Sequence, residues 1–432
     1  MEGVRRVGAL LARAAAIACV AAGVAGCGGS SALPPGNKIP GSELTVYVSV
    51  PLSGESAVQG EAVIRAASLA LAHIHNRIGR YQIVLKALND ASPTSGEPAG
   101  PSGPQARWNP GQTTLDAHIA IANPTTIGYI GDFDSGASAV SIPLLNRLDI
   151  VQISPWSTAV GLTSDKLGSS PGEPEAYYPT SRRTFARVVP NDLVQAQAQV
   201  TLQKSLGCRA DYVLYDGEYD GEETENAFVA LAPQQGLPVI AEQSYVPSAG
   251  SFTSIGQTVA QSGANCVLIA AITDAAAAAL TAQVAAQVPH DLLFGTAGLA
   301  ESTFTDPAQG GIPLSLDHRI LITAPAGDPA QPNARASAFY AQYERLYGAP
   351  EPAAIDGYEA MSLLLSAIGH ATDHGQRRAE RSAVVAAVFH TRDRHSVLGT
   401  YRIEADGDTS LNVYGVYRVV DGQLQFWRTV TG

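Results

Sequence analysis

Short apolar runs alternate with amphipathic segments along most of the chain, beginning at residue 44. Val63, Ala66, Ala70 and Ile74 recur at the spacing of one buried helix face, which predicts a helix over 58–76. The apolar runs are short and continuous, as in parallel strands that are covered on both faces. In the first half of the chain they predict strands at 44–50, 81–88, 126–130 and 149–153. Residues 137–148 can form a helix, although Pro143 limits it to a late start or a kink.

The second half of the chain repeats this alternation. Apolar runs predict strands at 212–215, 238–242, 267–271, 292–294 and 320–323. Amphipathic segments between them predict helices at 193–206, 222–235, 252–262 and 274–287. Two such runs of alternating strands and helices indicate an α/β protein with two doubly wound parallel-sheet lobes.

A third stretch follows with a different order of elements. It predicts helices at 334–347, 353–370 and 379–389 and then strands at 397–404, 412–420 and 424–428. Asp421 and Gly422 separate the last two strands, and this dipeptide is typical of a tight hairpin turn.

The first 27 residues have the pattern of an export signal. Arg5, Arg6 and Arg13 precede an uncharged apolar stretch, 14–26, which is too short to span a bilayer as a helix. Val24-Ala25-Gly26-Cys27 resembles a bacterial lipobox, in which the cysteine is acylated and becomes the first residue of the mature protein. The alternative is an ordinary signal peptide with an incidental cysteine. We therefore expect a lipoprotein signal peptide at 1–26, lipidation at Cys27 and a flexible Gly/Ser/Pro-rich tether over 27–43.

Composition narrows the class of protein. Charged residues make up 15% of the chain and apolar residues 45%, which is typical of a globular protein with large cores. The net charge is −12, and beyond the signal there is no cluster of Lys or Arg. Nucleic-acid binding needs basic surfaces, so we do not expect a nucleic-acid partner.

Two cysteines remain beyond the signal and the lipobox. Cys208 and Cys266 each precede an expected apolar strand, in a chain expected to reach an oxidising compartment. If those strands are parallel neighbours, the two Cα atoms can come within disulfide distance. The alternative is two buried free thiols.

Two segments are rich in Pro and Gly and have no clear period, 91–112 and 163–182. Long segments of this kind are usually functional lids or disordered insertions. We favour disordered surface insertions for both.

The chain carries none of the common catalytic or cofactor-binding motifs. His73 and His75 are two residues apart on a helix and point in different directions, and His390 and His395 lie in an expected loop. The Asp132-Phe133-Asp134 segment lacks the further oxygen ligands that calcium needs. We therefore expect no enzymatic activity, no cofactor and no metal.

Ligands of open α/β sheets bind beyond the carboxyl ends of the strands. Those positions are rich here in small, polar and aromatic residues, at 51–54, 131–136, 154–158, 216–219, 272–273 and 296–298. Ser135 opens a helix and is followed by Gly136, and its hydroxyl and the free N–H groups can bind an anion such as a carboxylate. Ser135 can instead be a plain N-cap, and Trp156 a core residue.

Several of these segments resemble the branched-chain amino-acid-binding family of ABC-importer receptors, which has the type 1 periplasmic-binding fold. The similarity covers roughly 44–430. The segments that carry it are P-L-S-G at 51–54, Leu88-Asn89-Asp90, I-G-Y-I-G-D-F-D-S-G at 127–136, I-P-L-L-N-R-L-D-I-V-Q-I-S-P at 142–155, Y-D-G-E-Y at 215–219, D-G-Y-E-A at 356–360 and G-T-Y-R-I-E-A-D-G-D at 399–408.

The resemblance implies two lobes, joined by three crossovers, that close over a solute. Lobe 1 would span 44–188 plus 325–410, and lobe 2 would span 189–324 plus 411–432. Ser135, Trp156 and Thr158 would contact a ligand carboxylate, and Tyr219 would cover the ligand. Ser53, Ser157 and Thr273 complete the expected binding set together with Ala297, which stands where the family places an acid for the ligand ammonium.

The function that this implies is a lipid-anchored solute-binding receptor on the outer face of the bacterial cytoplasmic membrane. We expect it to act as a monomer and to deliver a small polar solute, an amino acid or a related compound, to an ABC permease. One alternative is a sensory lipoprotein that reports the ligand to a membrane partner. A hydrolase with the same fold is a further alternative, but no catalytic motif in the sequence supports it.

Overall fold

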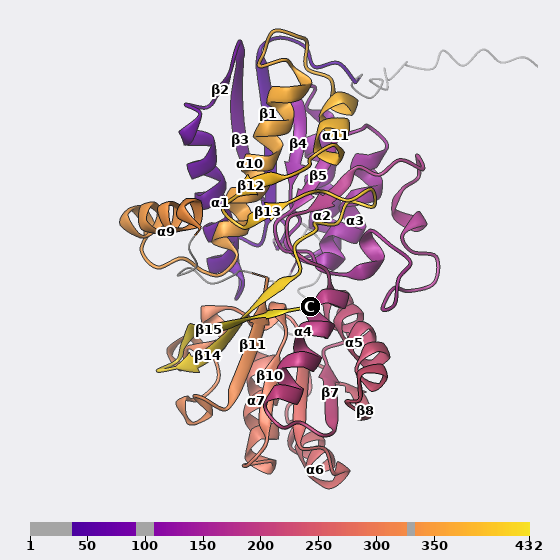
Figure 1. The fold of residues 1–432 in the computed structure, drawn as a ribbon, viewed down its shortest axis with the longest axis vertical. Coiled ribbons are helices and arrows are strands. Elements are labelled where there is room, and N and C mark those ends of the chain that lie inside the picture. Colours follow the sequence, from indigo (N-terminus) through magenta and orange to yellow (C-terminus); the bar gives the residue numbers. More distant parts are fainter. Residues whose placement is uncertain (1–36, 92–107, 326–332) are drawn as a thin grey trace, which may run out of the picture. The chain divides into compact units, whose positions relative to one another are not determined.

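The computed structural model describes residues 37–91, 108–325 and 333–432. The expected signal peptide, Cys27 and most of the expected tether lie outside the described residues. Within those ranges the chain forms two large sheets with helices against both. The predicted α/β architecture with two doubly wound, mainly parallel sheets is confirmed (Figure 1).

The first sheet has the strand order β2-β3-β1-β4-β5-β6. Its long strands are parallel, and only the short edge strand β2 runs antiparallel to its neighbour β3. The strands span Glu43–Val50 (β1), Arg77–Ile78 (β2), Tyr81–Asn89 (β3), Thr126–Ile130 (β4), Val151–Ser154 (β5) and Phe185–Arg187 (β6). All parallel strands therefore direct their carboxyl ends to the same edge of the sheet.

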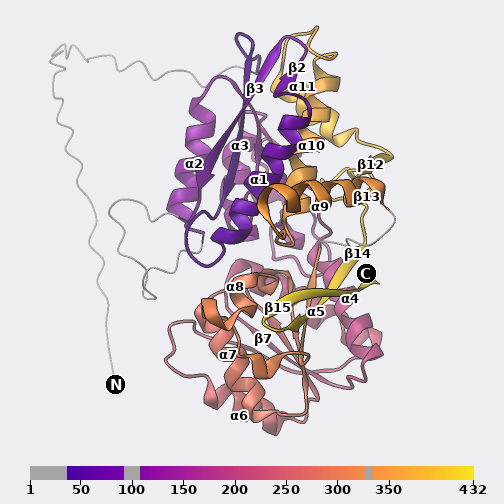
Figure 2. The same cartoon turned by 90° about the vertical axis from the view of Figure 1, so that its left-hand side faces the viewer.

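Helices cover both faces of this sheet (Figure 2). One face is covered by α1 (Ala57–His73), α10 (Ala354–Ala371) and α11 (Arg381–Phe389). The other is covered by α2 (Pro110–Ala122) and α3 (Ser135–Asn146), and α9 (Ala334–Tyr347) packs its aromatic residues against α1 and α10. We call this sheet with these helices lobe 1.

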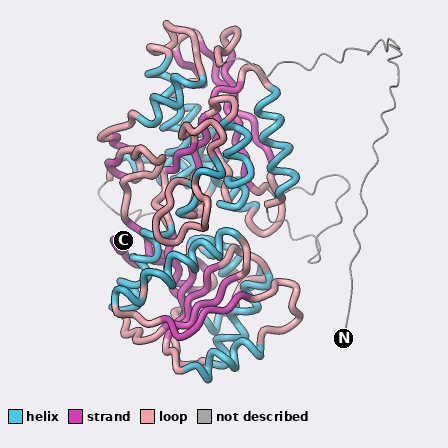
Figure 3. Tube along the Cα trace, turned by 90° about the vertical axis from the view of Figure 1, so that its right-hand side faces the viewer, coloured by secondary structure: helices cyan, strands magenta, loops and turns pink. Residues whose placement is uncertain are grey.

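The second sheet has the strand order β15-β14-β11-β10-β9-β7-β8. Figure 3 shows strands in magenta with helices in cyan around them. Its strands span Asp211–Tyr215 (β7), Val239–Ser244 (β8), Cys266–Ala270 (β9), Leu292–Gly295 (β10), Ile320–Ala324 (β11), Val413–Val420 (β14) and Gln423–Thr431 (β15). Strands β7 to β11 are parallel, and β14 and β15 form an antiparallel hairpin at the β11 edge. The turn of this hairpin falls at Asp421 and Gly422, as predicted.

The helices of this part are α4 (Asp192–Ser205), α5 (Tyr219–Leu231), α6 (Thr253–Ser262), α7 (Ala275–Gln287) and α8 (Ser302–Thr305). Alternate residues of β7 face different helices: Leu214 packs in one core with Val259 and Val284, and Val213 packs in another with Phe228. This alternation follows from the two-residue period of a strand and explains why the strand is apolar throughout. We call the second sheet with these helices lobe 2.

The chain passes between the lobes three times, after β6, after β11 and between β13 (Gly399–Tyr401) and β14. Two of these crossovers are tied together at Asp408. Its carboxylate accepts hydrogen bonds from Arg187 Nε at 2.8 Å and from Asn191 Nδ2 at 2.7 Å. The exact lobe boundaries expected from the sequence stay a prediction.

Cys208 and Cys266 form a disulfide, with their Cα atoms 5.7 Å apart. Strands β7 and β9 are parallel neighbours, and Asp211 lies opposite Cys266 in their register. The condition on which the pairing was expected is therefore met.

Three local expectations were wrong. Residues 163–182 are ordered and include a 3-10 helix, Glu175–Tyr177 (η2), with Glu173 and Tyr178 buried beneath it. Helix α3 does not start late, because it begins at Ser135 with Pro143 inside it. The strand expected at 397–404 is instead a small hairpin of β12 (Arg394–Ser396) and β13. Residues 92–107, the centre of the other irregular segment, lie outside the described residues, and α2 begins at Pro110, inside the expected bounds 91–112.

Candidate ligand cleft between the lobes

The carboxyl ends of both sheets meet at a contact between α3 of lobe 1 and α5 of lobe 2. Strand β4 ends at Ile130, and a short turn leads to Asp134, whose extended backbone starts helix α3 at Ser135. The first N–H groups of a helix have no partner within it and carry partial positive charge. Here the N–H of Ser135 donates to Asp220 Oδ1 at 2.8 Å, and that of Gly136 donates to Asp220 Oδ2 at 3.4 Å.

Asp220 comes from the first turn of α5, which follows β7 in lobe 2. Its carboxylate therefore binds the start of α3 with both oxygens, from across the cleft. Burial raises the pKa of Asp220, and the hydrogen bonds from Ser135 and Gly136 offset only part of this. The anion expected at the start of α3 is thus a side chain of the protein itself.

A small cavity lies beside this contact, and we call it the cleft cavity. Its volume is about 20 Å³, room for roughly one water molecule. Loops that follow strands of both sheets build its walls. The lining residues are Asp134, Trp156, Thr158, Asp220, Thr224, Ala271, Ile272, Thr296, Ala297 and Gly298.

Asp134 is the second acid in the cleft cavity. Its side chain is buried, at 7% exposure, and no hydrogen bond to its carboxylate is found among the described residues. Burial raises the pKa of Asp134 well above its usual range, and the nearby charge of Asp220 raises it further. Among the residues that line the cleft cavity there is no Lys, Arg or His. The surroundings of Asp134 therefore favour a bound cation or a proton.

The acidity extends around the cleft. Burial raises the pKa of Glu301 to about 8 and that of Glu223 to about 8. Glu223, on α5, accepts a hydrogen bond from the N–H of Gly161 in lobe 1 at 3.3 Å. Carboxyl groups of lobe 2 thus contact lobe 1 at several points, and burial raises their pKa values there.

Trp156 forms an aromatic wall of the cleft cavity. It follows β5, and its ring stacks on that of Phe133 with the centroids 5.6 Å apart and the planes 10° from parallel. Its backbone N–H donates to Ser154 Oγ at 3.2 Å, which fixes the turn. Trp156 is therefore well packed and also part of the cavity wall, and its contact with a ligand stays a prediction.

Three of the eight expected binding residues line the cleft cavity: Trp156, Thr158 and Ala297. The hydroxyl of Ser135 is fully buried and accepts hydrogen bonds from the N–H groups of Thr158 and Ala159, at 3.1 and 3.2 Å. It supports the cavity wall from behind.

The other four expected residues lie outside the cavity lining. Ser157 is buried against Ser138, at 2.8 Å between hydroxyl oxygens, and Ser53 Oγ accepts a hydrogen bond from Asn89 at 3.2 Å. Thr273 donates to the carbonyl of Gly298 at 2.8 Å. Tyr219 donates to Glu173 Oε1 at 2.5 Å. Tyr219 thus links α5 of lobe 2 to the ordered 163–182 segment, and its expected role over a ligand stays a prediction.

Asp220, Thr224 and Glu173 are the residues that the sequence did not single out. Asp220 lies on the first turn of α5, just beyond the 216–219 segment, and Thr224 lies one turn further along; this position after a strand was the available signal. Asp216 and Glu301 do not line the cavity. Asp216 accepts the backbone N–H of Ile272 at 3.0 Å and so holds the β9 loop.

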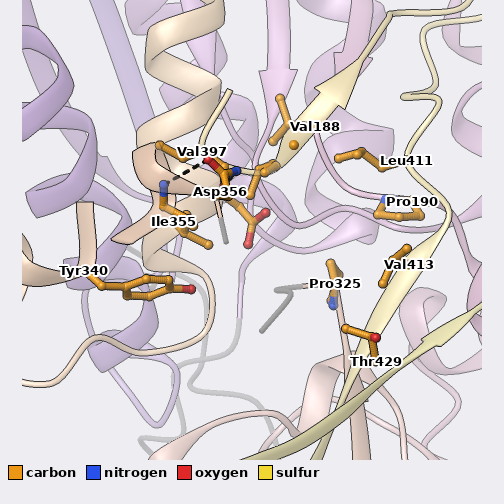
Figure 4. Close-up of a pocket in the computed structure, with 14 residues that line it drawn as sticks. Val188, Pro190, Pro325, Tyr340, Ile355, Asp356, Val397, Leu411, Val413 and Thr429 are labelled. Carbon is orange, nitrogen blue, oxygen red and sulfur yellow. Dashed lines mark hydrogen bonds between the residues drawn. The ribbon is translucent and has the colours of Figure 1, made fainter. Parts of the chain in front are cut away.

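A larger pocket of about 370 Å³ lies at the crossovers, and we call it the hinge pocket (Figure 4). Its lining is mostly apolar and includes Val188, Pro190, Pro325, Ile355, Val397, Leu411 and Val413. Asp356 is the one acid in this lining, and its Oδ2 is buried without a hydrogen-bond partner. Burial raises the pKa of Asp356 well above its usual range, and Glu359 adds to this.

No group of three or more His, Cys, Asp or Glu side chains in the described ranges is arranged to hold a metal ion. In the same ranges no helix has the length and apolar character needed to cross a bilayer.

Comparison with known proteins identifies relatives of this architecture. The sequence profile of a periplasmic binding protein family matches residues 107–423, which is more than half of the 432 residues. A leucine-binding protein from Thermotoga maritima has a similar structure, with a TM-score of 0.73 at 20% identity; the match covers 90% of this chain and 99% of that one.

Two further solved structures are similar over the same extent. A branched-chain amino-acid transporter substrate-binding protein from Streptococcus pneumoniae, in complex with isoleucine, has a TM-score of 0.71 at 16% identity and covers 90% of this chain and 100% of that one. A solute-binding protein of an ABC transporter from Rhodopseudomonas palustris, in complex with p-hydroxybenzoic acid, has a TM-score of 0.71 at 16% identity, covering 90% and 97%. At these identities the likeness shows the fold.

Proposed function

Because this chain belongs to the periplasmic binding protein family, we propose that it is an extracytoplasmic receptor that captures a small polar solute between its lobes and delivers it to an ABC importer. The single observation that carries the proposal is the cleft cavity, whose walls come from both lobes at the carboxyl ends of both sheets. Ligands of open α/β sheets bind at such positions. The solute-binding proteins with similar structures, described above, bind amino acids or an aromatic acid.

The mechanism we propose is closure driven by the solute. A solute in the cleft contacts Trp156 and Thr158 of lobe 1 and Thr224 and Ala297 of lobe 2 only when the lobes are closed. It therefore binds the closed form more tightly and shifts the equilibrium by that difference in affinity. The lobes also contact each other directly. Gln59 Nε2 of lobe 1 donates a hydrogen bond to the carbonyl of Ala300 in lobe 2 at 2.7 Å.

The proposal is tested by a thermal-shift screen of the full chain in mild detergent against amino acids, amides, short carboxylates, amines, sugars and nucleosides. A solute at 100 times its Kd stabilises the folded form by about 2.7 kcal/mol, which raises the melting temperature by several degrees. In Ala297→Phe a large ring fills the cleft cavity, and the response is expected to disappear. The matched control is Ala338→Phe, on the exposed side of α9, which should respond like the wild type. A response that survives Ala297→Phe would contradict this site.

We further propose that the receptor is held at the outer face of the membrane by acylation of Cys27, in the Val24-Ala25-Gly26-Cys27 sequence. Two or three acyl chains give a stable anchor. Expression in a bacterial host with radiolabelled palmitate should label the wild type and place it in the membrane fraction. Cys27→Ser should lose both label and membrane association. Equal labelling of the two proteins would contradict the anchor.

A further inference from the structure

We propose that this receptor supplies from Asp220 the carboxylate that occupies the start of α3, and that its solute is a small amine whose ammonium group pairs with Asp134 in the cleft cavity. The proposal rests on the proposed function and names the class of solute. It makes Asp220 and Asp134 the residues that determine specificity.

The first step is the occupancy of the α3 N-terminus. The N–H groups of Ser135 and Gly136 both donate to Asp220, one to each carboxylate oxygen. The hydroxyl of Ser135 accepts hydrogen bonds from the N–H groups of Thr158 and Ala159, which fix its position. The two N–H groups that a solute carboxylate would use, those of Ser135 and Gly136, are therefore occupied by Asp220.

The second step is the charge that a competing carboxylate would meet. A solute carboxylate at this position has to displace Asp220, which stays attached to α5 and close to the cleft. Asp134 lines the same small cavity, so up to three carboxyl groups would share a space without a Lys, Arg or His in its walls. Like charges at such short range repel strongly where water is excluded. The cleft should therefore bind solutes that carry a carboxylate more weakly than solutes that lack one.

The third step is the unpartnered acid. The carboxylate of Asp134 is buried at 7% exposure, lines the cavity and accepts no hydrogen bond from the described residues. A buried charge needs a partner. An ammonium group has three N–H donors and one positive charge, which match Asp134 together with the accepting hydroxyls of Thr224 and Thr296 in the same lining.

The fourth step is the aromatic and apolar wall. Trp156, which is held by stacking on Phe133, lines the cavity together with Ala271, Ile272 and Ala297. An indole ring attracts cations through its face and also packs well against alkyl groups. The cavity has about 20 Å³, room for roughly one water molecule, so the amine enters when the lobes part and is held in a cleft wider than this one. A short alkylamine or arylalkylamine has this combination of properties.

The experiment compares matched solutes that differ at the carboxylate. Isothermal titration of the full chain in detergent, at pH 7.5, uses isoleucine with 2-methylbutylamine and 4-hydroxybenzoate with 4-hydroxybenzylamine. The wild type is expected to bind the amine of each pair at least about tenfold more tightly. Asp220→Ala should bring the two members of each pair within about threefold of each other, because the start of α3 becomes free for a carboxylate.

Asp134→Asn, which keeps the shape of the side chain, should weaken amine binding at least about tenfold and leave the melting temperature near that of the wild type. Glu344→Gln, an exposed acid of α9, is the control that removes one negative charge elsewhere and should leave the preference unchanged. Wild-type protein that binds the carboxylate members as tightly as the amines overturns the inference while leaving solute binding intact. An unchanged preference in Asp220→Ala, with the variant folded by circular dichroism, overturns it as well. If no protein binds any member of either pair or of the wider screen, the proposed receptor function falls together with the inference.

Discussion

The cleft cavity and the hinge pocket differ in volume and in the polarity of their linings. The hinge pocket is large, about 370 Å³, and mostly apolar, with Asp356 as its one acid. The cleft cavity has about 20 Å³, and it gathers Asp134 and Asp220 from opposite lobes. Closure of two bodies on each other removes volume and brings charged side chains face to face. In a protein of this kind the chemistry of the walls therefore marks a candidate site better than its size does.

The largest effect in this comparison is expected at Arg187, which supports both regions. Its guanidinium pairs with Asp408 and donates to the carbonyls of Ser157 and Ala159, and the next residue lines the hinge pocket. Arg187→Ala leaves the buried Asp408 without its cation, so we expect a loss of about 3–5 kcal/mol in the free energy of unfolding. Urea unfolding measures it.

The control for this variant is Arg182→Ala, whose exposed side chain pairs with Asp149 at 2.5 Å. An exposed ion pair contributes at most about 1 kcal/mol. Similar small losses in the two variants would show that Arg187 is not the shared support of the cleft and the hinge.

Removal of the disulfide should lower the stability of lobe 2 without changing how the cleft binds its solute. The bridge joins the amino ends of β7 and β9, whereas the cleft lies at their carboxyl ends. The closed loop has a sequence separation of 58 residues, so Cys208→Ser with Cys266→Ser should lose about 4 kcal/mol in the chain-entropy model. Solute affinity by isothermal titration should stay within about twofold of the wild type. A tenfold fall would mean that the far ends of the strands also determine the cleft.

The acids around the cleft predict that stability depends on pH. Burial raises the pKa of Glu301 and of Glu223 to about 8, so the folded protein holds these protons more tightly than the unfolded chain does. The free energy of unfolding is then largest near the ordinary glutamate pKa of about 4.3 and falls as the pH rises toward about 8. We expect the melting temperature to be several degrees higher at pH 5 than at pH 8.

Burial alone would raise the pKa of Asp408, but Arg187 outweighs it and lowers that pKa, so the stability that this pair contributes is lost only at still lower pH. The Glu301→Gln, Glu223→Gln double variant should have a flatter profile between pH 5 and 8, and Glu344→Gln is the matched control. A profile that stays as steep in the double variant would exclude these two acids as its cause.

The smallest effect is expected at Asp356, the acid of the hinge pocket. Burial raises its pKa well above the usual range and so favours the neutral, protonated form of this side chain. Asp356→Asn is close in shape and also neutral, so it should change the free energy of unfolding by less than about 1 kcal/mol at pH 7 and leave amine affinity unchanged. Urea unfolding and titration check this next to Asp134→Asn. A loss of affinity at Asp356 would give the hinge pocket a part in solute binding.

The sequence predicted most strands of both sheets, although not the short β2 and β6, because a parallel strand covered on both faces is apolar throughout, as in Cys266–Ala270. It predicted poorly where order comes from distant contacts. Residues 163–182 are rich in Gly and Pro, but Glu173 is held by Tyr177 and Tyr219, and Tyr178 donates to the carbonyl of Leu162. The hydrophobic periodicity of the sequence indicates none of these contacts.

The candidate site divides in the same way. Strand ends alone pointed to Trp156, Thr158 and Ala297 on the cavity wall, because parallel strands end at one edge of a sheet. The bond from Asp220 to the start of α3 joins residues 85 apart in the sequence and belongs to the closed arrangement of two lobes. Periodicity and motif spacing carry no information on such a contact, so the acid that occupies the anion position was visible only in three dimensions.

The three crossovers also determine how the covalent chain responds to cutting. A protease that cleaves one of them leaves the lobes joined by the other two, so a single nick does not release a lobe. Neither lobe can be produced as one continuous fragment, because β11 of lobe 2 pairs with β14, and α9, α10 and α11 of lobe 1 lie between those strands in the sequence. The protein is therefore one interwoven unit in its covalent connectivity, although its two sheets are separate.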